Sequence, residues 1–170
     1  MIVQFVTNDI WYSRLTRWIF GEKPTHVGLS FDDEGVSIVM DISKPCGSLC
    51  SLKYWLSNKY YLVSSYPVNL SPEDERDAIL KVQFFCVLRE YAWGAYYFGL
   101  FTGLFHKLFG TPLPKTNPLE NFDKGLCTNI FDPIKSILLK YGIDMTNDDM
   151  YAKTPGMVEH YFNVLYGARK

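Results

Sequence analysis

Two runs of apolar residues are separated by the polar stretch Asp32-Asp33-Glu34-Gly35. Residues 26–31 and 36–42 are rich in β-branched and other apolar side chains, and the stretch between them has the composition of a turn. The pattern predicts two antiparallel strands joined as a β-hairpin. A hairpin limits the possible folds because it pairs the strand that begins at His26 with the strand that ends near Asp41.

The rest of the chain mixes segments typical of strands with segments typical of helices. Strands are predicted at 2–6 and 60–66, and helices at 11–20, 52–56, 71–90, 127–141 and 155–166. The chain has 170 residues and is long enough to bury a core without disulfides. We therefore expect one domain, residues 1–170, of the α+β class, with a small antiparallel sheet packed against several helices.

Residues 93–109 form an apolar and aromatic stretch in which Lys107 is the first charged residue. It is shorter than the roughly 20 residues that span a bilayer, and three glycines interrupt it. We interpret it as a buried or half-buried helix, with an interfacial membrane helix as the alternative. Residues 110–124 contain prolines and asparagines and are predicted to form a loop.

Charge and composition exclude several classes of function. The 17 Lys and Arg residues are balanced by 18 Asp and Glu residues, which leaves a net charge of −1. Nucleic-acid binding usually needs a strongly basic face, so no nucleic-acid partner is expected. The apolar run at the N-terminus has no basic residues before it and ends at Asn8, so we expect no signal peptide and a cytoplasmic location at synthesis. The aromatic share of 16% leaves peripheral association with a membrane surface open.

The cysteines are few and unevenly spaced, which is typical of free thiols in a reducing compartment. They are Cys46, Cys50, Cys86 and Cys127. Neither His106 nor His160 has zinc-ligand spacing to the first two, so no metal and no other cofactor are predicted. Cys86 is expected on the inner face of a helix.

Cys127 combines several features of a nucleophile. It begins an apolar, helix-like stretch, and both a helix N-terminus and a nearby imidazolium stabilise a thiolate. Gly125, just before it, would let the backbone bend sharply and leave amide N–H groups to hold an oxyanion. His26 is the candidate base, and Asp41 is the candidate partner that fixes the tautomer of its ring.

Each of these residues also has an alternative interpretation. Pro133 lies six residues after Cys127, so the regular helix can instead begin at Asp132 and leave the cysteine in an irregular turn. A single cysteine on an apolar helix is more often a small buried hydrophobe, and a single histidine in a strand is more often structural. Asp41 equally fits a turn residue that ends a strand.

Several segments resemble a known group of proteins over nearly the whole chain. Thr25-His26-Val27-Gly28-Leu29 resembles a strand of the circularly permuted NlpC-like papain-fold hydrolases, which include YiiX and relatives of lecithin:retinol acyltransferase. Cys127-Thr128-Asn129-Ile130 is similar to the Cys-Ser-Glu-Leu run of the YiiX-like proteins, with Asn129 in place of Glu. Residues 141–144 and 154–158 resemble segments that follow the nucleophile there. In this group the His strand precedes the Cys helix, the reverse of papain.

The resemblance implies a permuted papain-like fold and gives roles to individual residues. It makes Cys127 the nucleophile, His26 the base and Asp41 the polar third member of a triad. Tyr91-Ala92-Trp93-Gly94 is similar to a run in unpermuted relatives whose tyrosine lies near the oxyanion. Tyr91 therefore joins Gly125 as a candidate substrate or oxyanion contact.

The resemblance also gives a role to residues 98–124. The runs that flank this segment, 91–94 and 125–130, both resemble segments that form the site. The chain between them must then leave and return near Cys127. We expect it to be an insertion beside the active-site cleft that shapes substrate access.

The sequence therefore predicts a cysteine hydrolase, either a peptidase or amidase or an acyl-ester hydrolase or acyltransferase, that works through an acyl-enzyme. Its substrate would contain an amide or ester, as in a peptide, a peptidoglycan fragment or a lipid. The alternative is a binding or scaffold module that kept the fold and lost the chemistry. In that case Asn129 and Pro133 would be the positions at which this chain has diverged from the active members of the group. A non-catalytic protein of the membrane surface is a third hypothesis.

Overall fold

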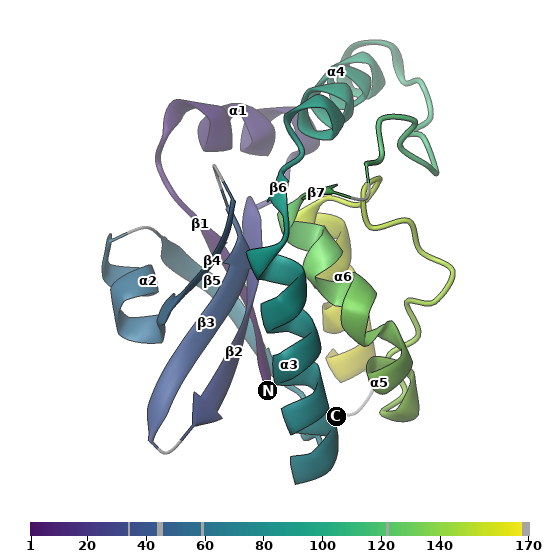
Figure 1. The fold of residues 1–170 in the computed structure, drawn as a ribbon. Coiled ribbons are helices and arrows are strands. Elements are labelled where there is room, and N and C mark those ends of the chain that lie inside the picture. The colour runs from purple at the N-terminus through teal and green to yellow at the C-terminus, as the bar shows by residue number, and fades with distance from the viewer. Residues whose placement is uncertain (34, 44–45, 59, 122, 168–170) are drawn as a thin grey trace.

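The computed structural model describes residues 1–33, 35–43, 46–58, 60–121 and 123–167. Within them, five antiparallel strands form one sheet in the order β4-β3-β2-β1-β5. One face of this sheet carries α3 and the helices of the C-terminal half, α2 lies on the other side, and α1 and α4 cross its end (Figure 1). The predicted α+β class, with an antiparallel sheet against helices, is confirmed.

The predicted hairpin is present. The strands are β1 (Ile2–Thr7), β2 (His26–Asp33), β3 (Val36–Ile42), β4 (Gly47–Ser51) and β5 (Tyr61–Pro67). In the hairpin, Gly28 pairs with Asp41 and Leu29 with Met40. The strand β4 was not predicted from the sequence, because its residues carry little of the β-branched pattern that marks β2 and β3.

The helices follow the predicted order. They are α1 (Trp11–Phe20), α2 (Leu52–Asn58), α3 (Pro72–Val87), α4 (Trp93–Phe109), α5 (Lys135–Lys140) and α6 (Pro155–Gly167). Gly21 ends α1 with a φ of 70°, which suits glycine. Ser71 caps α3 by accepting the amide hydrogen of Asp74. The α3 helix ends before the predicted Glu90, because that residue begins the short strand β6 (Glu90–Tyr91), which pairs with β7 (Lys124–Gly125).

The segment after Cys127 differs from the single helix predicted for it. Residues Cys127–Ile134 form a 3-10 helix, η1, and the α-helix α5 begins only at Lys135. Pro133 explains the difference, because its ring nitrogen carries no hydrogen for an α-helical bond. Asp132 does not cap the α-helix, whose N-cap is Ile134.

The main core holds η1 against the sheet. Phe5 of β1, Phe131 of η1 and Phe162 of α6 are fully buried, and the ring of Phe162 contacts both other rings. On the other face, Trp55 of α2 packs with Val6 and Val39. The two clusters fix the end of β2 between η1 and α2.

The helix α4 covers the predicted range and is half-buried, one of the two degrees of burial that we expected. Only Ala95 and Gly103 of its residues are buried. Gly103 lies against α1, where an added Cβ would be 2.4 Å from the Phe20 ring, and the opposite face of α4 is exposed. In the ranges that the structure describes, no helix is long and apolar enough to cross a membrane.

Candidate active site

His26 and Asp41 come together at the open end of the hairpin. His26 begins β2, and Asp41 lies opposite Gly28, two residues further along that strand. Residues two apart in a strand share a face, so both side chains lie on the same side of the sheet. His26 Nε2 is 2.8 Å from Asp41 Oδ2, and both side chains are buried. The predicted contact between them is present.

Asp41 accepts hydrogen bonds from two further elements. Trp55 of α2 donates its indole Nε1–H to Oδ2 at 2.9 Å. Ser48 of β4 donates to Oδ1, and Ser43 lies at the limit of a hydrogen bond from the same oxygen, at 3.5 Å. Burial alone would raise the pKa of Asp41, but His26 and these donors outweigh it and hold the pKa below its usual value. The carboxylate is therefore charged at neutral pH.

Gly28 makes room for the Trp55 indole. An added Cβ at residue 28 would lie 2.9 Å from Cζ2 of Trp55 and 3.1 Å from a methyl group of Val39. Side chains normally keep a wider separation, so no larger residue fits without moving the indole. The glycine of the His-Val-Gly run is thus explained by the contact that brings Trp55 to Asp41.

Tyr60 covers the His26 ring. The two rings are stacked, with centroids 4.7 Å apart and an interplanar angle of 5°. Burial, followed by the negative charge of Asp41, raises the pKa of Tyr60, so the phenol stays neutral. With Asp41 on one ring nitrogen and Tyr60 on one face, the imidazole is held in a fixed orientation.

Cys127 lies close enough to His26 for its charge to act on the imidazole. Burial lowers the pKa of His26, but the negative charge of Cys127, the hydrogen bond to Asp41 and the charge of Asp41 raise it to about 9. The His26 imidazole is therefore protonated at neutral pH, the state in which a histidine beside a cysteine nucleophile can give a proton to a leaving group.

Asn129 shapes the turn that carries Cys127. Its side-chain oxygen accepts the amide hydrogen of Leu126 at 2.8 Å, and its amide group donates to Asp132 at 2.8 Å. Its backbone amide in turn donates to the Leu126 carbonyl at 3.0 Å. The bond from the Leu126 amide to the Asn129 side chain is the half of a capping box that Glu or Gln often makes at the start of a helix. Asn129, a departure from the Cys-Ser-Glu-Leu run, thus fills a structural role here.

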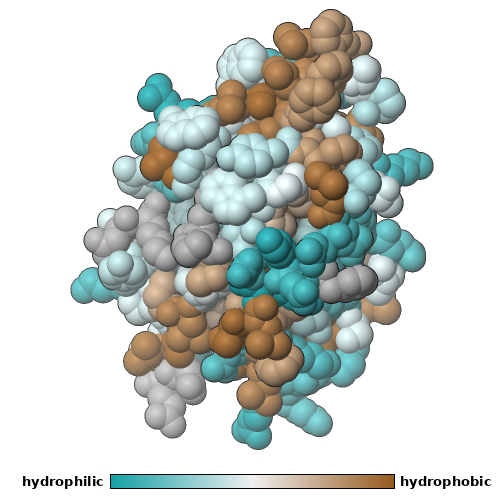
Figure 2. All heavy atoms as spheres, turned by 45° about the horizontal axis from the view of Figure 1, so that its top comes forward, coloured by the Kyte–Doolittle hydropathy of each residue, from teal (hydrophilic) through white to brown (hydrophobic). Residues whose placement is uncertain are grey.

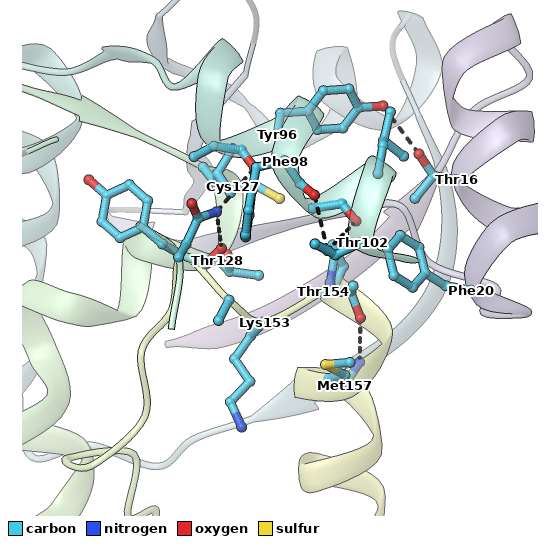
Figure 3. A pocket seen from close by; sticks show the side chains of 18 of the residues that line it. Thr16, Phe20, Tyr96, Phe98, Thr102, Cys127, Thr128, Lys153, Thr154 and Met157 are labelled. Carbon is cyan, nitrogen blue, oxygen red and sulfur yellow. Dashed lines mark hydrogen bonds between the residues drawn. The ribbon is translucent and has the colours of Figure 1, made fainter. Parts of the chain in front are cut away.

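Cys127 lies in the wall of an apolar cavity. Figure 3 shows its sulfur pointing into the cavity, beside Phe98, while the amine of Lys153 points away. The side chains that line the cavity are mostly apolar and include Phe20, Ala95, Leu100, Leu113 and Met157. Threonine hydroxyl groups also border it, among them those of Thr16, Thr102, Thr128 and Thr154. The cavity suits an apolar group of a substrate.

A second, more polar recess borders His26. Its lining includes Asn8, Tyr12, Ser13 and Ser43. It shares Tyr91 and Tyr96 with the apolar cavity, so these two tyrosines form part of both walls. The thiol and the imidazole are thus bordered by cavities of different polarity.

The structure places Tyr91 and Gly125 next to each other, paired across β6 and β7. Tyr91 is buried, and burial raises its pKa, as does the negative charge of Cys127, so its hydroxyl stays protonated. Gly125 does not form the sharp bend that we expected. It lies in a strand, and its lack of a side chain instead accommodates Ile42, whose Cδ1 would be 3.0 Å from an added Cβ.

Part of the segment 98–124 lies beside the cysteine, as predicted. Phe98, Leu100 and Leu113 from this segment line the apolar cavity. The segment is also anchored, because the buried Asn117 donates to the carbonyl oxygens of Ala95 and Tyr151. The effect of this segment on substrate access stays a prediction.

Three side chains of the site were not predicted from the sequence: Ser48, Trp55 and Tyr60. Ser48 falls in the unpredicted strand β4, and neither aromatic residue lies in a motif. All three contact His26 or Asp41 from elements whose placement depends on tertiary packing. Among the described residues, no group of three or more His, Cys, Asp or Glu side chains is arranged to hold a metal ion.

Comparison of the sequence with models of known protein families and with curated proteins gave no match. The hypothesis about function therefore depends on the geometry of the site and on the motif resemblance.

Proposed function

We propose that the protein is a cysteine hydrolase or acyltransferase with a permuted papain-like fold. The observation that carries the proposal is the position of Cys127, at the wall of an apolar cavity and close to the hydrogen-bonded pair His26–Asp41. A thiol, an imidazole and an orienting carboxylate are the three groups that nucleophilic acyl transfer requires.

In the first half of the reaction, the Cys127 thiolate attacks the carbonyl carbon of an amide or ester. The π electrons move to the carbonyl oxygen, and a tetrahedral intermediate forms. The intermediate collapses as the bond to the leaving nitrogen or oxygen breaks, and the His26 imidazolium gives its proton to that atom. The product is a thioester on Cys127 and a free amine or alcohol.

In the second half, His26 is neutral and acts as a base. It takes a proton from water or from another acceptor hydroxyl or amine, whose oxygen or nitrogen attacks the thioester carbonyl. The second tetrahedral intermediate collapses and expels the Cys127 thiolate, which restores the ion pair. Water gives hydrolysis, and another acceptor gives acyl transfer.

The neighbouring groups have supporting roles in this scheme. Asp41, held by Trp55 and Ser48, orients the imidazole and stabilises its charge. The protonated Tyr91 hydroxyl is the candidate donor to the oxyanion, because its side chain borders the same cavity as Cys127. The apolar cavity would receive the acyl group and the polar recess the leaving group.

The test is to trap the acyl-enzyme. The protein is mixed with p-nitrophenyl acetate and p-nitrophenyl octanoate, p-nitrophenolate release is followed, and the modified residue is located by peptide mass spectrometry. We expect a burst of release and an acyl group on Cys127, both lost in His26→Ala. His160→Ala is the matched control, because that histidine is exposed on α6 and should behave as wild type.

Cys86 provides an internal control. It is buried, and burial, followed by the charge of Asp41, raises its pKa to about 12, so it should react slowly. Equal alkylation of Cys86 and Cys127 by iodoacetamide in the folded protein, or the absence of an acyl-enzyme with either ester, would instead support a binding module without catalysis.

A further inference from the structure

An aromatic ridge runs along the outer face of α4. We use the name α4 ridge for Trp93, Tyr97, Phe101, Phe105, Leu108 and Phe109, all of which are exposed. Phe101 and Phe109 are 60% and 69% exposed. Figure 2 shows hydrophobic side chains gathered over this helix. Soluble proteins rarely expose so many large apolar side chains together, so the ridge is a candidate interaction surface.

The helix α1 extends this surface. Trp11 and Trp18 on its outer face are 72% and 55% exposed. The two helices pack together, and Lys107 of α4 lies over the Trp18 ring, 4.7 Å from its centroid. Three of the four tryptophans of the chain thus lie on one surface, and the fourth, Trp55, is buried.

The two helices carry basic but no acidic residues, although Asp9, just before α1, pairs with Arg17. None of the 18 acidic residues lies in residues 10–21 or 91–119, the segments that contain α1 and α4. Exposed basic groups are present on both helices, with Arg14 on α1 and Lys107 on α4. Because the whole chain has a net charge of −1, this basic surface complements an anionic partner and contrasts with the rest of the molecule.

We propose that the α4 ridge, together with Trp11 and Trp18, is a docking surface for a membrane that contains anionic lipids. Phenylalanine and leucine side chains would enter the boundary between headgroups and acyl chains. Tryptophan and tyrosine side chains would lie at the level of the headgroups, where they are most stable. Arginine and lysine side chains would meet lipid phosphates, since their long stems let the charge stay in the headgroup layer.

A second copy of the chain complements this surface less well. In a two-fold symmetric dimer the same surface occurs on both sides of the interface. Arg14 and Lys107 would then face a surface on which neither α1 nor α4 supplies a carboxylate to pair with them. Anionic lipids satisfy both the apolar and the basic parts of the surface.

The docking surface adjoins the site. Phe98, Leu100 and Thr102 of α4 line the apolar cavity that holds Cys127. Docking would therefore bring the cavity close to the lipid. If the proposed function also holds, the acyl group of a lipid is the substrate class that this placement favours, whereas membrane binding itself requires no catalysis.

The test is sedimentation of the full chain with vesicles of phosphatidylcholine alone or mixed with phosphatidylglycerol. We expect partitioning into the anionic vesicles that weakens in high salt. Phe101→Ser with Phe109→Ser should weaken it at least tenfold, on the order of what two partly inserted rings contribute. Cys127→Ala should bind as wild type, which separates this result from the proposed function.

The matched control is Phe84→Ser with Val87→Ser on α3. These side chains are 70% and 73% exposed but lie outside the docking surface, so binding should not change. A measurement on the unmodified chain adds a check that needs no variant: tryptophan emission should shift to the blue with anionic vesicles and be quenched by brominated lipid.

Three results would overturn the proposal. They are the absence of binding to anionic vesicles, equal losses in the α3 and α4 variants, and a lipid-free dimer that dissociates when Phe101 and Phe109 are replaced. The last result would make the ridge an interface between copies.

Discussion

The indole of Trp55 occupies the space that a side chain at residue 28 would need. A Cβ added to Gly28 would be 2.9 Å from Trp55 Cζ2, and Trp55 is itself fully buried between Val6 and Val39. The indole therefore has little room to yield. This packing connects the glycine to Asp41, because it sets the position from which Trp55 donates to that carboxylate.

Gly28→Ala adds only one methyl group, but it should lower both the stability of the protein and the reactivity of Cys127. We expect a loss of about 1–3 kcal/mol in the free energy of unfolding from overpacking, and a slower reaction of Cys127 with iodoacetamide. Urea denaturation and alkylation kinetics measure the two effects. Gly99→Ala on α4 is the control, since an added Cβ there meets no atom within 4 Å. Similar behaviour of the two variants would show that the Trp55 contact has no influence on the thiol.

The sequence predicted the hairpin because the residues that determine it are close together in the chain. A polar turn between two apolar runs predicts the pairing of β2 with β3, and that pairing alone brings His26 near Asp41. Cys127 was selected by its surroundings in the sequence and by a family resemblance. The structure brings it to His26 through the packing of η1 on the sheet.

Other parts of the site were not predictable because they depend on contacts between distant segments. Trp55 reaches Asp41 only because α2 packs over the sheet, and Gly125 is small because Ile42 lies against it. The degree of burial of α4 was also not predictable from its composition. Its apolar composition indicated burial, but only the side at Gly103 has a partner helix within the described residues.

The His26 pKa makes stability depend on pH in a defined direction. The pKa is raised from 6.5 to about 9 in the folded protein, so protonated His26 stabilises the fold fully below pH 6.5. This contribution is lost as the pH rises through about 9. We expect wild type to lose stability relative to His26→Gln over that range, as measured by urea denaturation at pH 6 and pH 9.5. His160→Gln should follow wild type, and a constant difference between wild type and His26→Gln would contradict the raised pKa.

Asn129→Ala should destabilise the turn before Cys127. The change removes two side-chain hydrogen bonds and leaves the Leu126 amide without its partner, at a cost of about 1–3 kcal/mol in the free energy of unfolding. Alkylation of Cys127 should also slow, because the turn sets the position of its sulfur. Asn147→Ala is the control, because it removes the same side-chain amide from an exposed residue. If Asn129→Glu keeps the reactivity that Asn129→Ala loses, the capping role is supported; if both variants react as wild type, it is wrong.

Leu113→Trp should shift the preference for acyl chains if the apolar cavity binds the acyl group. Leu113 is half-buried, lines the cavity and comes from the loop after α4, so a larger ring there would narrow the space without entering the main core. We expect kcat/KM for p-nitrophenyl octanoate to fall at least tenfold, the effect of excluding about two methylene groups, while the value for the acetate ester stays within about twofold. Leu119→Trp, at an exposed residue of the same loop, should change neither value. Equal losses on both esters would mean that Leu113 affects the reactive groups rather than the acyl chain, and an unchanged ratio would place the acyl chain outside this cavity.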